Sequence, residues 1–155
     1  MKKEYIHIYN NIVKLTRNKD LYKNLKKQDI FSDRLIYFLL HFSFFLNVYR
    51  NKENKKILQD IYDFIFRQLE LSIREIGYSD QSINKRMKDY INLLYEVIGK
   101  TYNWENLSIN KKKSIIGYFV NNLSNEDDLV EYFEKYRLNL INNTLNFQIK
   151  GVDKG

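Results

Sequence analysis

A chain of 155 residues with 44% hydrophobic content is long enough for one domain with a buried core. Because it has no cysteine, disulfides, thiolate metal sites and a cysteine nucleophile are excluded, and the absence of proline with only five glycines disfavours sheets, which need frequent turn residues. A net charge of +7 favours partners with negative surfaces, namely anionic lipid, nucleic acid or an acidic protein, although a merely soluble lysine-rich surface has the same composition.

The chain begins with an amphipathic segment from Tyr5 to Arg17, whose apolar residues recur at helical spacing. The preceding residues, Met1 to Glu4, lack the apolar run of a signal peptide, so we expect the protein to remain where it is translated. Residues 18–29 are mostly polar, and they predict no more than a short, weakly packed turn of helix.

The segment from Leu35 to Tyr49 reads LIYFLLHFSFFLNVY and is apolar on nearly every side. It is shorter than the run of about 20 apolar residues that a membrane-spanning helix needs. A helix of this kind is usually the central helix of a bundle. The alternative is that one side stays open as a groove for a client protein. The candidates for lining such a groove are Phe38, His41, Phe42, Phe45 and Tyr49.

A helix–loop–helix follows, with one helix from Asn54 to Gly77 and a second from Ser82 to about Tyr102. Gly77 suits the left-handed position that commonly ends a helix. We expect Asp80 to orient the loop, either as an Asx-turn residue or by pairing with a cation, and Ser82 to begin the second helix. Gly77, Asp80 and Ser82 are therefore interpreted as the residues that structure the loop.

Four cations gather at this loop: Arg74 before it, and Lys85, Arg86 and Lys88 in the first two turns of the second helix. Cations there oppose the positive N-terminal end of the helix dipole, which is unfavourable for local stability. The same arrangement is typical of a site that faces an anion. We therefore predict that these four residues form a docking patch for a membrane, a ribosome or a client protein.

The last third of the chain predicts two more helices, from Ser108 to Leu123 and from about Glu126 to Leu145. Trp104 lies in the linker before them, where we expect it to plug one end of the bundle. Residues 148–155 are expected to form a flexible tail. Together the patterns predict an all-α fold, with residues 1–147 in a single-domain bundle of about six helices around the central apolar, aromatic-rich helix.

Chemistry-bearing patterns are hard to find. Of the two histidines, His41 lies in the most apolar segment and is interpreted as a buried, hydrogen-bonded side chain, with a haem or metal ligand as the alternative. The sequence has no Gly-rich phosphate loop, no Glu-x-x-His pair and no evident nucleophile–base pair. It also lacks a nucleic-acid reader motif, so sequence-specific DNA binding is not expected. We predict no catalytic residue, no metal and no cofactor.

Several blocks of the sequence resemble the ubiquinol–cytochrome c chaperone family. The strongest is residues 74–88, REIGYSDQSINKRMK, which is similar almost position by position. Weaker matches are Tyr9-x-x-Ile12-Val13 with Arg17 and Tyr22, then Asp29, Arg34 and Leu40-His41, and finally Asn122 with Leu129-x-x-Tyr132. Leu94-Tyr95-Glu96-Val97 departs from the Phe-Tyr-Gly-Arg expected there. Asp29 and Arg34 are interpreted as an internal ion pair that fixes the entry to the apolar helix.

The resemblance implies an assembly factor and not an enzyme. Members of the family help newly made cytochrome b into the ubiquinol–cytochrome c reductase (bc1) complex. The expected partners are cytochrome b or another bc1 subunit as client, a small assembly partner protein, the ribosome and an anionic membrane surface. The expected location is the cytoplasm, peripheral at the inner face of the inner membrane. Two alternatives stay open: a basic membrane or RNA adaptor without a client, and a haem or quinone carrier that uses His41.

Overall fold

The computed structural model describes residues 5–21, 31–120 and 126–151, and within them the chain forms seven α-helices and no strand. The helices are α1 Ile6–Thr16, α2 Phe31–Tyr49, α3 Lys55–Ile76, α4 Asp80–Thr101, α5 Ile109–Phe119, α6 Glu126–Ile141 and α7 Leu145–Lys150. Two short 3₁₀ turns are Lys19–Leu21 and Trp104–Asn106. The prediction of an all-α, single-domain bundle is confirmed.

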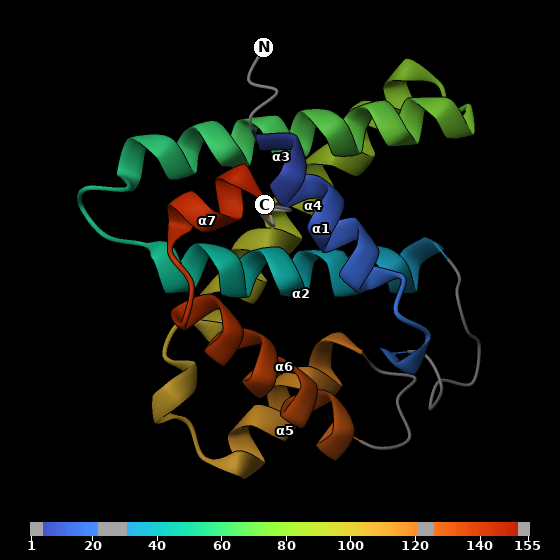
Figure 1. Ribbon diagram of the computed structural model, residues 1–155. Helices are drawn as coiled ribbons and strands as arrows, with labels where there is room; N and C mark the ends of the chain where they lie inside the picture. Colours follow the sequence, from blue (N-terminus) through green and yellow to red (C-terminus); the bar gives the residue numbers. More distant parts are fainter. Residues whose placement is uncertain (1–4, 22–30, 121–125, 152–155) are drawn as a thin grey trace.

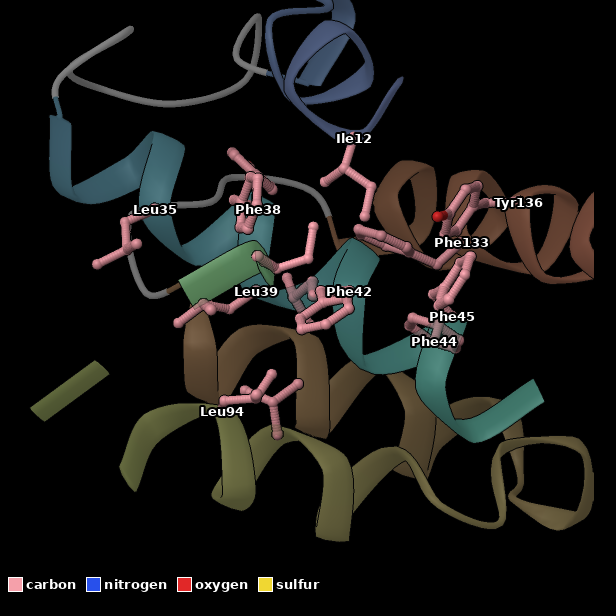
Figure 2. Packing of buried hydrophobic residues seen from close by; sticks show 14 of the residues in the cluster. Ile12, Leu35, Phe38, Leu39, Phe42, Phe44, Phe45, Leu94, Phe133 and Tyr136 are labelled. Atoms are coloured by element: carbon pink, nitrogen blue, oxygen red, sulfur yellow. The ribbon is translucent and has the colours of Figure 1, made fainter. Parts of the chain in front are cut away.

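Helix α2 lies at the centre of this bundle, with α3 above it, the α5–α6 pair below it and α1 crossing it in Figure 1. Its neighbours bury it from several sides, which satisfies an apolar surface that runs all round the helix. Phe38 lies toward Ile12 of α1, whereas Phe44 lies toward Phe133 of α6 (Figure 2). The rings of Phe44 and Phe133 are stacked with centroids 5.2 Å apart. Burial of each such side chain stabilises the fold by about 1.5–3 kcal/mol.

Helices α3 and α4 form the predicted helix–loop–helix, and local chemistry sets both of its ends. Gly77 has a φ of 106°, in the left-handed region, and its N–H donates to the Arg74 carbonyl at 3.0 Å. The Ser79 hydroxyl accepts a hydrogen bond from the Ser82 N–H at 3.2 Å, so Ser79 is the N-cap of α4. The helix therefore begins at Asp80, two residues before the predicted start, because Ser79 and not Ser82 supplies the cap.

Helix α6 packs against α2, and α5 packs against α6, on the lower side of α2 in Figure 1. The linker before them holds Trp104, which is 1% exposed and meets the ring of Phe44 edge-on at 5.0 Å. Trp104 thus lies in the core against α2, and its predicted place at one end of the bundle stays a prediction. Ser108 caps α5 by accepting a hydrogen bond from the Lys111 N–H at 3.1 Å. The predicted end of this helix at Leu123 was wrong, because α5 ends at Phe119 and Val120, with φ −118° and ψ 77°, is no longer helical.

The C-terminal end differs from the prediction of one helix to Leu145 followed by a tail from residue 148. Helix α6 ends at Ile141, and the Thr144 hydroxyl accepts a hydrogen bond from the Phe147 N–H at 3.0 Å, capping the separate helix α7. Helix α7 packs on α1 and extends to Lys150, so residues 148–150 are helical. The local signals of this break are Asn142 and Asn143 directly after α6, which favour a helix end, and Thr144, which favours a new helix start.

Candidate functional site

The five residues proposed to line a client groove, Phe38, His41, Phe42, Phe45 and Tyr49, are all in the core. None of them is more than 8% exposed. Their burial agrees with the interpretation of this segment as the central helix of the bundle. The five side chains do not together line an open groove along α2. A surface for a client therefore has to be sought where other helices leave apolar side chains uncovered.

His41 is fully buried and both of its ring nitrogens are hydrogen-bonded. Nδ1 donates to the Tyr37 carbonyl at 2.7 Å, so Nε2 accepts from the Tyr132 hydroxyl, also at 2.7 Å. The rings of Phe133 and Tyr136 surround it as well, with centroids 5.1 and 4.8 Å away. Burial lowers its pKa to about 4, although the bond to Tyr37 acts in the opposite direction. A neutral imidazole with both nitrogens occupied has no lone pair left for a haem or metal.

Arg74 holds the α3–α4 loop in place. Its Nη1 donates to Asp80 Oδ1 at 2.7 Å and its Nη2 donates to Glu70 Oε2 at 3.0 Å. These two carboxylates raise the pKa of the Arg74 guanidinium, with Asp80 the stronger influence. Asp80 therefore orients the loop by pairing with a cation, which was one of the two roles predicted for it. Arg74, in turn, has its positive charge matched twice over.

The three cations on α4 have different surroundings. Arg86 lies over the ring of Tyr78, with its guanidinium carbon 3.9 Å from the ring centroid. Lys85 pairs with Asp89 at 3.3 Å. Lys88 is exposed and makes no ion pair within the described part of the chain. Carboxylates therefore accompany Arg74 and Lys85, so the positive field at this loop is weaker than the sequence spacing suggested, and a single docking patch of all four cations stays a prediction.

The proposed ion pair between Asp29 and Arg34 involves a residue, Asp29, that lies outside the described part of the chain. Arg34 is on the first turns of α2, where it borders a small groove of about 210 Å³. This groove runs between α1, α2 and α3. Its lining residues are Tyr9, Val13, Thr16, Arg17, Arg34, Leu35, Phe38, Leu69, Ser72 and Ile76. Phe38 is the one residue of the proposed client set on this wall.

Ile76 is the residue of this groove that periodicity alone would misplace. It continues the apolar stripe of α3, on which Ile73 is fully buried, yet Ile76 is 55% exposed. The reason is visible in Figure 1, where the C-terminal end of α3 extends beyond the helices that cover its middle. The sequence signal for the exposure of Ile76 is its position directly before the glycine that ends the helix. An apolar residue in the last turn of a helix has fewer neighbours to cover it.

A metal centre is not indicated for the residues that the structure describes, since no cluster of three or more His, Cys, Asp or Glu side chains is found there. Over the same residues, no helix has both the length and the apolar character needed to cross a membrane.

A family model described as ubiquinol-cytochrome C chaperone matches residues 23–102, just over half of the chain. The chain belongs to the ubiquinol–cytochrome c chaperone family. No curated protein and no solved structure matches it. The matched segment includes all of α2, α3 and α4, and therefore both His41 and the loop at Gly77.

Membership of this family supports a chaperone role in assembly of the bc1 complex. A bc1 subunit is the kind of client that this role requires. A chaperone acts by binding, so membership also points away from enzymatic activity.

Proposed function

We propose that this chaperone binds newly made cytochrome b and assists its assembly into the bc1 complex at the inner face of the inner membrane. The observation that carries the proposal is the family match over α2, α3 and α4. Cytochrome b has many membrane-spanning helices, so before insertion it exposes apolar segments that a chaperone must cover. A small assembly partner protein and the ribosome belong to the same proposal as further contacts during synthesis.

The surface we propose for the client is the groove between α1, α2 and α3. Its walls include Leu35, Phe38 and Leu69, and Ile76 extends it toward the α3–α4 loop. Arg17 and Arg34 border it. An apolar segment of the client would lie along the apolar wall, and polar groups at its end would meet the arginines. The predicted set of five client residues is thereby reduced to Phe38, with Ile76 added.

The cations at the α3–α4 loop remain a proposed docking surface for anionic groups. Arg86 and Lys88 are the better candidates, because Arg74 and Lys85 already pair with carboxylates of their own. Cations near an anionic membrane surface contribute about 1 kcal/mol each, so two of them would assist binding without sustaining it alone. Ribosomal RNA and an acidic loop of the client are the other anionic partners that these cations could meet.

The test is a deletion strain combined with crosslinking in cells. We expect deletion to reduce the b- and c-type haem signals of the bc1 complex in difference spectra, with other cytochromes retained. A photo-crosslinking residue at Ile76 should capture cytochrome b during its synthesis. The matched control is the same residue at Leu138, which is 53% exposed on α6, away from the groove. Equal capture from both positions, or none from Ile76, would argue against the groove as the client surface.

A further inference from the structure

A second and larger groove lies at the opposite end of the α3–α4 pair from the Gly77 loop. It has a volume of about 530 Å³ and lies between the end of α2, the first two turns of α3 and the last half of α4. Its apolar lining consists of Leu46, Leu58, Tyr62, Tyr95 and Ile98. The rings of Tyr62 and Tyr95 are stacked along one wall, with centroids 6.4 Å apart. The groove is thus a mainly apolar hollow open to the exterior.

Three cations border this groove: Arg50, Lys52 and Lys55. No carboxylate lines it, and none of the three cations forms an ion pair within residues 5–21, 31–120 and 126–151. Arg50 is held at the edge, with its guanidinium carbon 4.0 Å from the centroid of the Tyr102 ring and its Nη2 donating to Asn47. This arrangement contrasts with the Gly77 loop, where carboxylates accompany most of the cations.

The start of α3 adds to the positive field at the same edge. Its first turn contains no acidic residue, and the side chain of the N-cap Asn54 makes no capping hydrogen bond. The backbone N–H groups of a helix start carry a partial positive charge that favours an anion. The first N–H groups of this segment already have acceptors, since Asn54 N–H donates to Asn51 Oδ1 and Lys55 N–H to the Lys52 carbonyl, so the helix start adds only a weak positive field. The three unpaired cations are therefore the main feature that favours an anion beside the apolar lining.

The size of the groove restricts what it can take. Two turns of helix occupy on the order of 850 Å³, so a helical segment could lie along either groove but could not be enclosed in it. The larger groove falls within the range of about 300–1,000 Å³ that is typical of small-molecule sites, which are mostly apolar with a few polar groups at one side. An amphiphile with a narrow apolar chain and an anionic head satisfies both the volume and the charge.

We propose that this groove binds one acyl chain of an anionic phospholipid, with Lys52, Lys55 and Arg50 at the headgroup phosphate. The chaperone would thereby be held at a membrane by the first turns of α3, leaving the groove between α1, α2 and α3 available. The inference deepens the membrane part of the proposed function. It does not depend on the client, because the two grooves share no residue.

The test uses the full chain and lysophosphatidylglycerol below its micelle concentration, with binding measured by calorimetry. We expect saturable binding of one molecule per chain. Lysophosphatidylcholine, whose head has no net charge, should bind at least about tenfold more weakly, and glycerol phosphate, which lacks the chain, should not bind. Equal affinity for the two lysolipids, or binding of glycerol phosphate as tight as that of the lysolipid, would overturn the proposal.

Variants locate the binding on the groove. The double variant K52E/K55E should lose at least about tenfold in affinity. The matched control K14E/K111E, with the same charge change at exposed lysines of α1 and α5 that line neither groove, should retain the affinity of the parent chain. Tyr95→Ala should also weaken binding, whereas Tyr118→Ala, equally exposed at 59% on α5, should not. Circular dichroism of each variant checks that the helices are retained.

Two results would overturn the assignment of the groove. One is an unchanged affinity in K52E/K55E, and the other is an equal loss in both double variants, which would mean that only the net charge matters. Tighter binding of an acidic amphipathic peptide than of lysophosphatidylglycerol would assign the groove to a protein partner instead. None of these results affects the crosslinking from Ile76, so failure here is distinguishable from failure of the client proposal.

Discussion

His41 and its neighbours illustrate how single residues in this chaperone obtain their properties. The imidazole bonds to Tyr37 within α2 and to Tyr132 on α6, a residue 91 positions further along the chain. Nε2 can accept from Tyr132 only while it is unprotonated, and desolvation outweighs the bond to Tyr37 and keeps the ring neutral. Its role in the structure is to connect the central helix to α6 through a satisfied polar pair inside an aromatic cluster.

The neutral state of His41 makes stability depend on pH. Its pKa is about 4 in the folded chain and 6.5 in the unfolded chain, so between these values the unfolded chain binds more protons. The contribution of neutral His41 to the unfolding free energy is therefore fully present above pH 6.5 and is lost as the pH falls toward 4. The loss amounts to about 1.4 kcal/mol per pH unit, or roughly 3 kcal/mol in total.

Urea denaturation at about pH 7 and about pH 5 measures this effect with few carboxylates titrating. We expect the parent chain to lose roughly 2 kcal/mol of unfolding free energy between these pH values through His41. His41→Gln should be less stable than the parent chain at pH 7. Its unfolding free energy should not show the decrease of roughly 2 kcal/mol between pH 7 and pH 5 that His41 causes. His7→Gln, at the exposed histidine, is the control and should retain it. A decrease of the same size in the parent chain and in His41→Gln would contradict the assignment.

At the scale of elements, the α3–α4 helix–loop–helix is specified mainly by its own residues. Gly77 ends α3, Ser79 begins α4, and Arg74 bonds across the loop to Asp80. The ion pairs of this loop are exposed, so water and salt screen them and each contributes little to stability. The backbone conformation of Gly77 is the stronger constraint, because an L side chain at a φ of 106° is strained.

Two glycine substitutions separate backbone conformation from packing at the two ends of α4. A Cβ at either Gly77 or Gly99 would meet no atom within 4 Å. Gly77→Ala should lower the unfolding free energy by about 1–2 kcal/mol, because alanine is strained at a positive φ. Gly99→Ala, inside a helix, should raise it by about 0.5–1 kcal/mol. Urea denaturation measures both changes, and effects of the same sign would mean that the loop conformation is not what distinguishes them.

At the scale of the whole molecule, Tyr49 joins the end of the central helix to the C-terminal segment. Its hydroxyl donates to the Leu140 carbonyl at 2.7 Å, the Asn143 carbonyl 3.0 Å away is a second acceptor for the same proton, and the oxygen accepts from Gln148 Nε2 at 3.2 Å. These bonds lie at the junction between α6 and α7. Helix α7 in turn packs on α1. One hydroxyl thus helps to connect the two ends of the chain to its centre.

Tyr49→Phe tests this connection. The change keeps the ring but leaves two carbonyls without this donor, so we expect a loss of about 1–3 kcal/mol of unfolding free energy. Tyr118→Phe is the control, since its exposed hydroxyl bonds only to the exposed Glu96 and should change stability by less than about 0.5 kcal/mol. Thermal and urea denaturation give both values. A change in Tyr49→Phe no larger than that of the control would mean that the C-terminal segment is held by apolar packing alone.

The sequence by itself determined the features that depend on residues within a turn or two of one another. The all-α class, the central position of the apolar segment, the end of α3 at Gly77 and the start of α5 after Ser108 all follow from local spacing and capping. The start of α4 at Asp80 was missed by two residues because two serines could each supply the cap.

Only the tertiary structure decided which apolar and charged side chains remain available to a partner. It buried Phe42 and Phe45, left Ile76 exposed, matched Arg74 with two carboxylates and assembled a cationic, apolar-lined groove from α2, α3 and α4. The physical reason is that burial and charge pairing depend on neighbours far along the chain. Such neighbours, unlike a cap or a helical stripe, leave no mark in the local sequence.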